Sequence, residues 1–276
     1  MITIVKGDGT REPFNIEKLE HSMLRCGANK GTVEKVAREV ARTIQDGMST
    51  GEIYKNAFKT LRKEERALAA RYSMRRAILD MGPTGFPFED YFSELMRAKG
   101  YETKVRQILQ GRCAEHEVDV VLNKGGKAIG AELKFHNTLG FKTDLKTTLY
   151  VRARFWDIEH AAEDRHETCP ISEGWLVTNT KFTDAAIHYA TCTRLMLFGW
   201  SYPHTENLAS IIQETGLYPI TVLTTISKKE EAALLAQQVT LCRDIARNPE
   251  ALERAGIPKR KHADIITESA ALCGSA

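Results

Sequence analysis

Two apolar segments joined by a glycine-rich turn constrain the fold of this chain more than any other feature. The segments are residues 118–122 (VDVVL) and 128–135 (AIGAELKF), and the turn is residues 124–127 (KGGK). Short runs rich in β-branched residues are typical of strands, and a glycine-containing turn between two of them indicates a hairpin. The sequence therefore predicts a β-hairpin whose strands carry charged side chains among apolar ones.

The charged residues of this hairpin are Asp119, Glu132 and Lys134. Glu132 and Lys134 are two positions apart, so their side chains point to the same face of the strand. Two carboxylates on adjacent strands can hold a divalent cation such as Mg²⁺, which also keeps waters and meets substrate phosphates. Lys134 would then orient the nucleophile or offset transition-state charge. A cross-strand ion pair between Asp119 and Lys134, with Glu132 facing solvent, is the alternative.

Positive charge gathers around this hairpin and in the N-terminal third. From Lys124 to Phe155 seven Lys and Arg residues stand against Glu132 and Asp144, and residues 1–82 hold 16 basic against 11 acidic residues. A basic surface beside an acidic motif is expected of an enzyme that approaches a phosphate backbone. This distribution favours a nucleic-acid or nucleotide ligand.

The composition excludes several other classes of protein. A hydrophobic content of 42% and a charged content of 27% are typical of globular domains, and no apolar run approaches the length of a membrane span. The N-terminus lacks the features of a signal peptide, so we expect a cytoplasmic protein without membrane contact. The six scattered cysteines contain no CxxC pair, and we expect reduced thiols.

The region with two prolines and two glycines at residues 81–87 divides the chain. Before it, we expect a strand at 2–6, a tight turn at 7–10, and helices at 15–27, 32–46, 49–62 and 63–80. Asn15 is the predicted N-cap of the first helix, and Ser49 or Thr50 that of the third. After it, we expect helices at 87–99, 142–160 and 181–195 and strands at 101–108, 118–122, 128–135, 174–178 and 195–199. This order predicts an α/β fold with a mixed sheet flanked by helices.

Residues 85–204 resemble the restriction-endonuclease-like fold of PD-(D/E)xK nucleases, closest to the Mrr (type IV restriction) branch. The resemblance rests on residues 88–92 (FEDYF), 116–121 (HEVDVV), 131–137 (AELKFHN) and 175–186 (WLVTNTKFTDAA). It implies that Asp119 and Glu132 bind Mg²⁺ or Mn²⁺, that Lys134 is catalytic, and that Glu89 completes the site. The implied activity is hydrolysis of DNA phosphodiester bonds.

Polar residues around this motif are candidates for contacts with DNA. The predicted nucleic-acid-binding residues are His116, His136, Asn137, Lys146, Arg152 and Arg154. The arginines and Lys146 are the better candidates for phosphate contacts, since cationic side chains supply many of the contacts to nucleic-acid backbones. Phe155 and Trp156 are expected in the core instead of on a base-stacking surface.

Residues 1–82 resemble the ATP-cone, a regulatory module that binds ATP or dATP in ribonucleotide reductases and in a repressor of their genes. The resemblance rests on residues 6–9 (KGDG), 14–18 (FNIEK) and 49–53 (STGEI), and Gly7 stands where the family usually has arginine. The implied nucleotide-binding residues are Ile4, Lys6, Asn15, Lys18 and Thr50. Lys6 and Lys18 can meet phosphates, and Thr50 lies at a helix N-terminus, where anions are favoured.

The remaining residues, 205–276, are expected to be helical. Short helices around Gly256 resemble a helix-hairpin-helix in a general way, which would grip a phosphate backbone; a helical bundle that packs on the nuclease or on another subunit is the alternative. Together these features predict a homo-oligomeric, metal-dependent DNA endonuclease regulated by ATP or dATP. The alternative is a non-catalytic nucleic-acid-binding regulator whose oligomeric state is set by the nucleotide.

Overall fold

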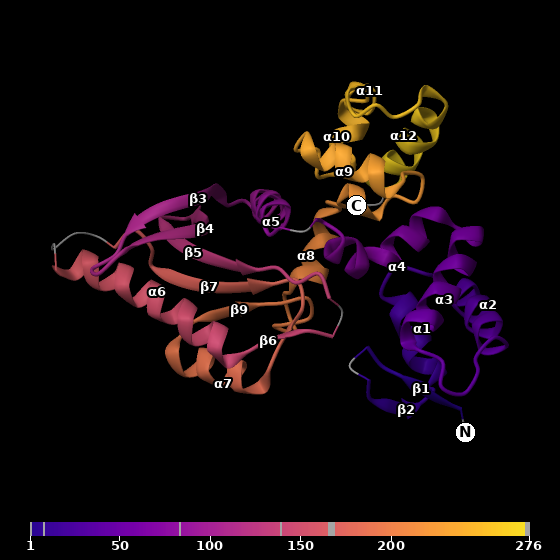
Figure 1. Ribbon diagram of the computed structural model, residues 1–276, viewed down its shortest axis with the longest axis horizontal. Helices are drawn as coiled ribbons and strands as arrows, with labels where there is room; N and C mark the ends of the chain where they lie inside the picture. The colour runs from indigo at the N-terminus through magenta and orange to yellow at the C-terminus, as the bar shows by residue number, and fades with distance from the viewer. Residues whose placement is uncertain (1, 8, 83, 139, 165–168, 274–276) are drawn as a thin grey trace.

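A computed structural model describes residues 2–7, 9–82, 84–138, 140–164 and 169–273 of the chain. Helices form the N-terminal and C-terminal parts, and a mixed sheet with helices on both faces lies between them in the sequence (Figure 1). The predicted α/β class and the mixed sheet are confirmed.

The N-terminal part is a two-stranded hairpin followed by four helices. Its elements are β1 (Thr3–Val5), β2 (Arg11–Pro13), α1 (Ile16–Leu24), α2 (Lys30–Ala41), α3 (Thr50–Glu64) and α4 (Arg66–Leu79). The predicted strand and four helices are all present, while position 8 of the predicted turn lies outside the described residues. A bridge between Val5 and Ser49 brings the hairpin against the start of α3.

The helix ends follow their capping residues. The Asn15 side chain accepts a hydrogen bond from the Lys18 backbone N–H, as predicted. Ser49, and not Thr50, is the N-cap of α3, and it forms a capping box with Glu52. Along α3 the buried residues Ile53, Ala57 and Leu61 recur every four positions, so one face of the helix enters the core.

The central sheet has five strands in the order β3-β4-β5-β7-β9. They are β3 (Glu102–Gln110), β4 (Glu115–Lys124), β5 (Lys127–Lys134), β7 (Glu173–Thr178) and β9 (Met196–Phe198). The first three strands are antiparallel, and β5, β7 and β9 are parallel to one another. The predicted hairpin is therefore the β4–β5 unit in the middle of the sheet.

Helices cover both faces of this sheet (Figure 1). The helices α6 (Leu145–Asp164) and α7 (Asp184–Thr193) pack on one face, and α5 (Phe86–Ala98) and α8 (Leu208–Thr215) on the other. The predicted helices at 142–160 and 181–195 begin later than expected, because Lys142–Thr143 (β6) pairs with Lys181–Phe182 (β8). These two short strands form a separate parallel sheet beyond the ends of β5 and β7.

Phe155 sets how closely α6 approaches the sheet. Its buried ring lies over Gly130 and Gly174, which are directly paired on β5 and β7. The two glycines leave room for the ring. Trp156 departs from the prediction, because it is exposed and its ring lies tilted against that of His160, with ring centroids 4.0 Å apart.

The C-terminal part consists of short helices, as predicted. They are the 3₁₀ turn Ile220–Val222, α9 (Lys228–Ala236), α10 (Cys242–Arg247), α11 (Glu250–Arg254) and α12 (Lys259–Cys273). Their apolar side chains share one core with α4, α5 and the α5-facing side of the sheet. The packing on the rest of the chain is therefore observed, and the helix-hairpin-helix stays a prediction. Within the described ranges no helix is long and apolar enough for a membrane span.

Candidate active site on the sheet and the N-terminal nucleotide site

The site begins where β4 and β5 separate. Their register pairs Val120 with Ala131 and continues from there toward the turn. Just before that pair, the Asp119 carboxylate accepts a hydrogen bond of 2.6 Å from the Leu133 backbone N–H. The side chain of Asp119 thus takes the place of a backbone acceptor, which fixes its position beside β5.

Glu132 and Lys134 lie on the face of β5 that meets α6. The Lys134 ammonium is 2.6 Å from one Glu132 oxygen, and the Arg154 guanidinium of α6 donates to the other. Glu132 is only 2% exposed, so its charge depends on these two cations. The alternative arrangement, Asp119 paired with Lys134 and Glu132 in solvent, is not the one observed.

The two carboxylates influence each other. Burial raises the pKa of Asp119, and the negative charge of Glu132 raises it further, while the hydrogen bond from Leu133 acts in the opposite direction. Such repulsion of a half-buried carboxylate by a buried one is what a bound cation relieves. Asp119 and Glu132 therefore suit a hard divalent ion.

Glu89 lies near this pair but has its own partner. It is buried at the start of α5, and its carboxylate is 3.1 Å from the Arg106 guanidinium, which also contacts Asp90 at 2.9 Å. Burial raises the pKa of Glu89, and Arg106 lowers it. Across the described residues no group of three or more His, Cys, Asp or Glu side chains is placed to hold a metal. A cation at this site would therefore have two carboxylate ligands, with Glu89 held apart by Arg106.

Arg106 was not among the sequence-predicted residues. It lies opposite Asp119 in the β3–β4 register, between the pairs Val105–Val120 and Gln107–Val118. Its φ of 50° is left-handed, a conformation that costs a non-glycine residue about 1–3 kcal/mol. The sequence gives little indication that Arg106 pairs with Glu89, because an arginine in a strand of alternating polarity is expected to face solvent.

Arg154, predicted as a DNA contact, lies inside the site. Besides Glu132 it hydrogen-bonds the backbone oxygen of Glu117 at 2.8 Å and the Tyr150 hydroxyl. The Lys134 ammonium lies 5.8 Å from the centre of the Tyr150 ring, and Tyr150 is exposed. Tyr150 is a further residue that the sequence analysis missed. It comes one helical turn before Arg154, and this spacing is the only signal.

The two predicted histidines are held by other residues. His116 contacts Asp157 of α6 at 2.7 Å, and this hydrogen bond is the main reason why the pKa of Asp157 falls to about 2. The His136 ring lies 3.2 Å from the Thr143 hydroxyl and is tilted against the Phe141 ring, and burial lowers the pKa of His136. His136 lies two residues beyond Lys134, the last residue of β5, whereas His116 of β4 connects the sheet to α6.

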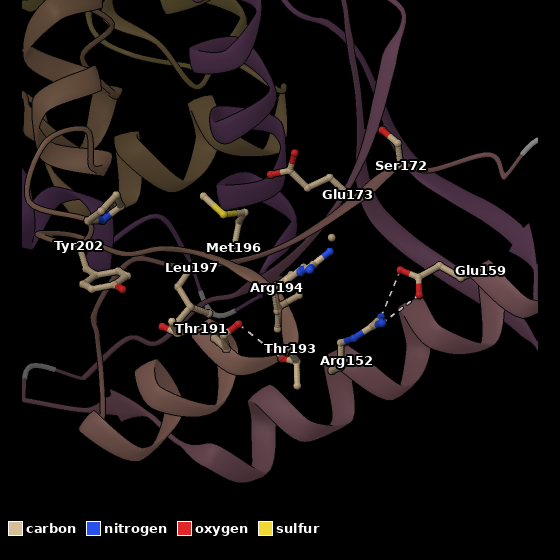
Figure 2. Close-up of a pocket in the computed structure, with 14 residues that line it drawn as sticks. Arg152, Glu159, Ser172, Glu173, Thr191, Thr193, Arg194, Met196, Leu197 and Tyr202 are labelled. Atoms are coloured by element: carbon tan, nitrogen blue, oxygen red, sulfur yellow. Dashed lines mark hydrogen bonds and ion pairs between the residues drawn. The ribbon is translucent and has the colours of Figure 1, made fainter.

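The remaining predicted DNA contacts separate into two groups. Asn137 and Lys146 are exposed, beyond the end of β5 and at the start of α6. Arg152 is paired with Glu159 and lines a cavity of about 690 Å³ between α6, the start of β7 and the α7–β9 connection (Figure 2). Arg194 also borders this cavity, whereas Asp119, Glu132 and Lys134 do not.

The predicted nucleotide residues surround Glu12. Lys6 and Lys18 both contact its carboxylate, at 2.7 and 3.1 Å, and these bonds lower the pKa of Glu12. Ile4 is buried and pairs with Glu12 across the hairpin. Asn15 caps α1, and Thr50 is the first residue of α3, which the Val5–Ser49 bridge holds beside the hairpin. Glu12 itself was not predicted as a site residue.

Comparison with known proteins agrees with part of this picture. Residues 2–81 match the model of the ATP cone domain, and residues 218–273 match the model described as AF1548-like, C-terminal. An uncharacterized protein of Archaeoglobus fulgidus is 37% identical over 183 residues, which are 66% of this chain and 99% of that protein. The chain belongs to the AF1548-like family.

A solved member of the AF1548-like family has the same fold over most of its length. The crystal structure of AF1548, a protein of unknown function, is 34% identical and superposes with a TM-score of 0.58. The match covers 70% of this chain and 100% of that one. The predicted ATP cone is confirmed, and it supports regulation by a bound nucleotide.

Proposed function

We propose that the chain is a Mg²⁺-dependent (or Mn²⁺-dependent) DNA endonuclease of the restriction-endonuclease-like fold, regulated by ATP or dATP at its cone. The observation that carries this proposal is the pair of carboxylates at the point where β4 and β5 separate. Asp119 and Glu132 lie there half-buried and buried, with Lys134 at 2.6 Å from Glu132. A buried like-charged pair is costly unless a cation compensates for it.

The arrangement of the sheet is consistent with this fold. The β4–β5 hairpin is followed by α6 and then by β7, which is parallel to β5. The chain order of these elements and the residues 131–137 and 175–186 are those on which the resemblance to the Mrr branch rests. Asn137, Lys146 and the exposed Tyr150 follow Lys134 along the chain and would meet the DNA backbone.

Each residue of the site would have a separate role in the reaction. Asp119 and Glu132 would hold a divalent cation, which supplies a polarised phosphoryl oxygen and an activated water when bound. Lys134, freed from Glu132, would hold the attacking water or offset the charge that develops on the phosphate. Arg154 would keep Glu132 oriented, and Tyr150 would limit the movement of both cations. Glu89 would act through Arg106 by fixing the strand opposite Asp119.

One observation favours the non-catalytic alternative. Both oxygens of Glu132 already have cationic partners, Lys134 and Arg154, so the site can persist as a salt-bridge network. A protein that only grips nucleic acid, with an oligomeric state set by nucleotide, would be compatible with that network. The two candidate functions, nuclease and non-catalytic regulator, differ in whether the chain cuts DNA.

Plasmid cleavage tests the proposal directly. Supercoiled plasmid is incubated with the full chain and Mg²⁺ or Mn²⁺, with and without ATP and dATP. We expect Asp119→Asn and Lys134→Ala to reduce the cleavage rate at least ~100-fold, in the range found when one transition-state-stabilising group is removed. Glu115→Gln, an exposed carboxylate at the start of the same strand, is the control and should cut normally. Equal cleavage by all four proteins would show that another site or a contaminant is responsible.

A further inference from the structure

The small β6–β8 sheet places two lysines directly opposite each other. Its register pairs Lys142 with Lys181. Like charges directly opposite each other on neighbouring strands are destabilising. The pair would be relieved by an anion that lies between or above the two ammonium groups.

Three cations of the ATP cone lie near enough to this lysine pair to influence the charge of Lys181. Lys181 loses hydration, and its pKa is lowered further by the charges of Arg75, Lys142, Lys6 and Arg25, in that order. Arg75 lies on α4, Arg25 directly follows α1, and Lys6 directly follows β1. Figure 1 shows the β1–β2 hairpin and β6 on the sides of the two halves that face each other. Cations from the two parts of the chain therefore converge on one place.

These cations have few acidic neighbours. Lys6 is paired with Glu12, whereas Arg25, Arg75, Lys142 and Lys181 form no ion pair with any other residue that the structure describes. Arg75 is half-buried, and burial lowers its pKa. Five positive groups from separate segments form a site for a compact polyanion.

We propose that Lys142 and Lys181 complete the phosphate site of the ATP cone, so that one nucleoside triphosphate is held jointly by the cone and the small β6–β8 sheet. This inference rests on the nucleotide-binding half of the proposed function and is independent of the nuclease half. Lys6 would contact the triphosphate from the cone, with Arg25 and Arg75, and the two lysines would contact it from the opposite side.

The location of the lysines relates this site to the catalytic residues. Lys181 is three residues beyond Thr178, which pairs with Lys134 across β5 and β7. At about 3.3 Å per residue this is on the order of 10 Å along the chain. Thr143, next to Lys142, also hydrogen-bonds Thr178 at 3.2 Å. A triphosphate at this position would therefore hold the cone against the end of the sheet that carries the catalytic lysine.

A triphosphate fits this cluster better than a stretch of nucleic acid. The five cations come from five separate segments, and four of them are close enough to Lys181 to lower the pKa of its ammonium group. Nucleic-acid surfaces instead distribute their cations along the path of the backbone. In addition, three of the five cations, Lys6, Arg25 and Arg75, belong to the residues matched as ATP cone.

Calorimetric titration of the full chain with ATP, ADP and AMP tests the proposal. We expect the double variant Lys142→Ala/Lys181→Ala to bind ATP about tenfold more weakly, a loss that corresponds to about 1.4 kcal/mol. AMP binding should change little, because the lysines contact the outer phosphates. The matched control is Lys104→Ala/Lys127→Ala, which removes two exposed lysines of the five-stranded sheet, outside the cluster, and should bind ATP normally.

A second variant and a DNA titration complete the experiment. Lys142→Glu should weaken ATP binding more than Lys142→Ala, because the new carboxylate repels phosphate and pairs with Lys181. Unchanged ATP affinity in both cluster variants would overturn the inference and leave the nuclease proposal intact. Weaker duplex DNA binding by the cluster variants, without weaker ATP binding, would also overturn the inference and leave the nuclease proposal intact. A wild-type chain that binds no ATP would overturn both the inference and the nucleotide half of the proposed function.

Discussion

Charged residues in this chain obtain their roles from partners that are distant in sequence. Glu132 meets Arg154 from the next helix, and Glu89 meets Arg106 from the next strand. Each pair is shielded from water, where ionic contacts are strong but where loss of one partner leaves an uncompensated charge. The sequence identified both carboxylates as site residues, but it did not identify Arg106 at all and did not place Arg154 beside Glu132.

Arg194 illustrates how the backbone conformation of one residue can lower the stability of the folded protein. It ends α7 in a left-handed conformation with a φ of 57°, a position that favours glycine. We expect Arg194→Gly to raise the free energy of unfolding by about 0.5–1 kcal/mol, since the left-handed strain of about 1–2 kcal/mol disappears and glycine's larger entropy loss offsets part of it. Urea unfolding measures the difference. Arg194→Ala keeps the strain and should show no gain, so a stabilised alanine variant would contradict this explanation.

At the scale of single elements, the close approach of α6 to the sheet depends on paired glycines. A Cβ atom at Gly174 would come within 2.5 Å of the Phe155 ring, and one at Gly130 within 2.8 Å. The sequence indicates the strands and the helix from their apolar patterns. It did not indicate that Gly130 and Gly174 lie side by side, because that pairing joins strands separated by a whole helix.

Gly174→Ala tests this packing. We expect the substitution to lower the free energy of unfolding by about 1–3 kcal/mol, the usual cost of inserting a methyl group into a filled core. Gly7→Ala is the control, because nothing lies within 4 Å of the added atom. Adding Phe155→Leu to Gly174→Ala should recover part of the loss in thermal unfolding. A double variant no more stable than Gly174→Ala would mean that the ring is not the obstacle.

The start of α9 should make stability depend on pH. The Glu230 carboxylate accepts hydrogen bonds from the Ser227 backbone N–H at 2.7 Å and from Lys261 at 2.6 Å, and its pKa falls to about 2, with the Lys261 bond as the largest cause. A carboxylate with a lowered folded pKa stabilises the protein above its unfolded value and loses this effect as pH falls through the folded one. The contribution should therefore disappear between about pH 4.5 and pH 2.

Urea unfolding of wild type and Glu230→Gln at several pH values measures this dependence. The variant should be less stable than wild type at pH 7, and the difference should shrink steadily below pH 4.5. The exposed Glu250 gives the matched control, Glu250→Gln, which should follow wild type throughout. A difference that stays constant down to pH 2.5 would show that the loss comes from the cap geometry and not from the charge.

At the scale of the whole molecule, α4 connects the cone to the rest of the chain. Its residues Leu68 and Ala69 belong to the core of the cone, while Met74, Ala77 and Ile78 belong to the core shared with α5, the sheet and the C-terminal helices. Polar contacts reinforce the connection, including Lys228 with Asp80 at 2.8 Å and Arg62 with the Thr224 carbonyl at 3.1 Å. Two cores that share one helix should unfold together.

A destabilising substitution in the core of the cone should therefore destabilise the sheet as well. All three tryptophans, Trp156, Trp175 and Trp200, lie outside the cone, so their fluorescence reports on the sheet region alone. We expect Leu61→Ala to cost about 2–5 kcal/mol and to shift the fluorescence and circular-dichroism transitions together. Lys59→Ala, on the exposed side of the same helix, should shift neither. If only the circular-dichroism transition moved, the cone would be an independent folding unit.

The sequence by itself determined the local features of this protein. Capping residues, apolar periodicity and the Gly125–Gly126 turn are interactions between near neighbours, so they predicted the helices, the β4–β5 hairpin and the mixed α/β class. The motif residues around Lys6 and Lys18 identified the cone. Only the tertiary structure decided which charges meet: Arg154 with Glu132, and Arg106 with Glu89. These contacts join segments far apart in the chain, and their pairing depends on how helices and strands pack, which no local pattern encodes.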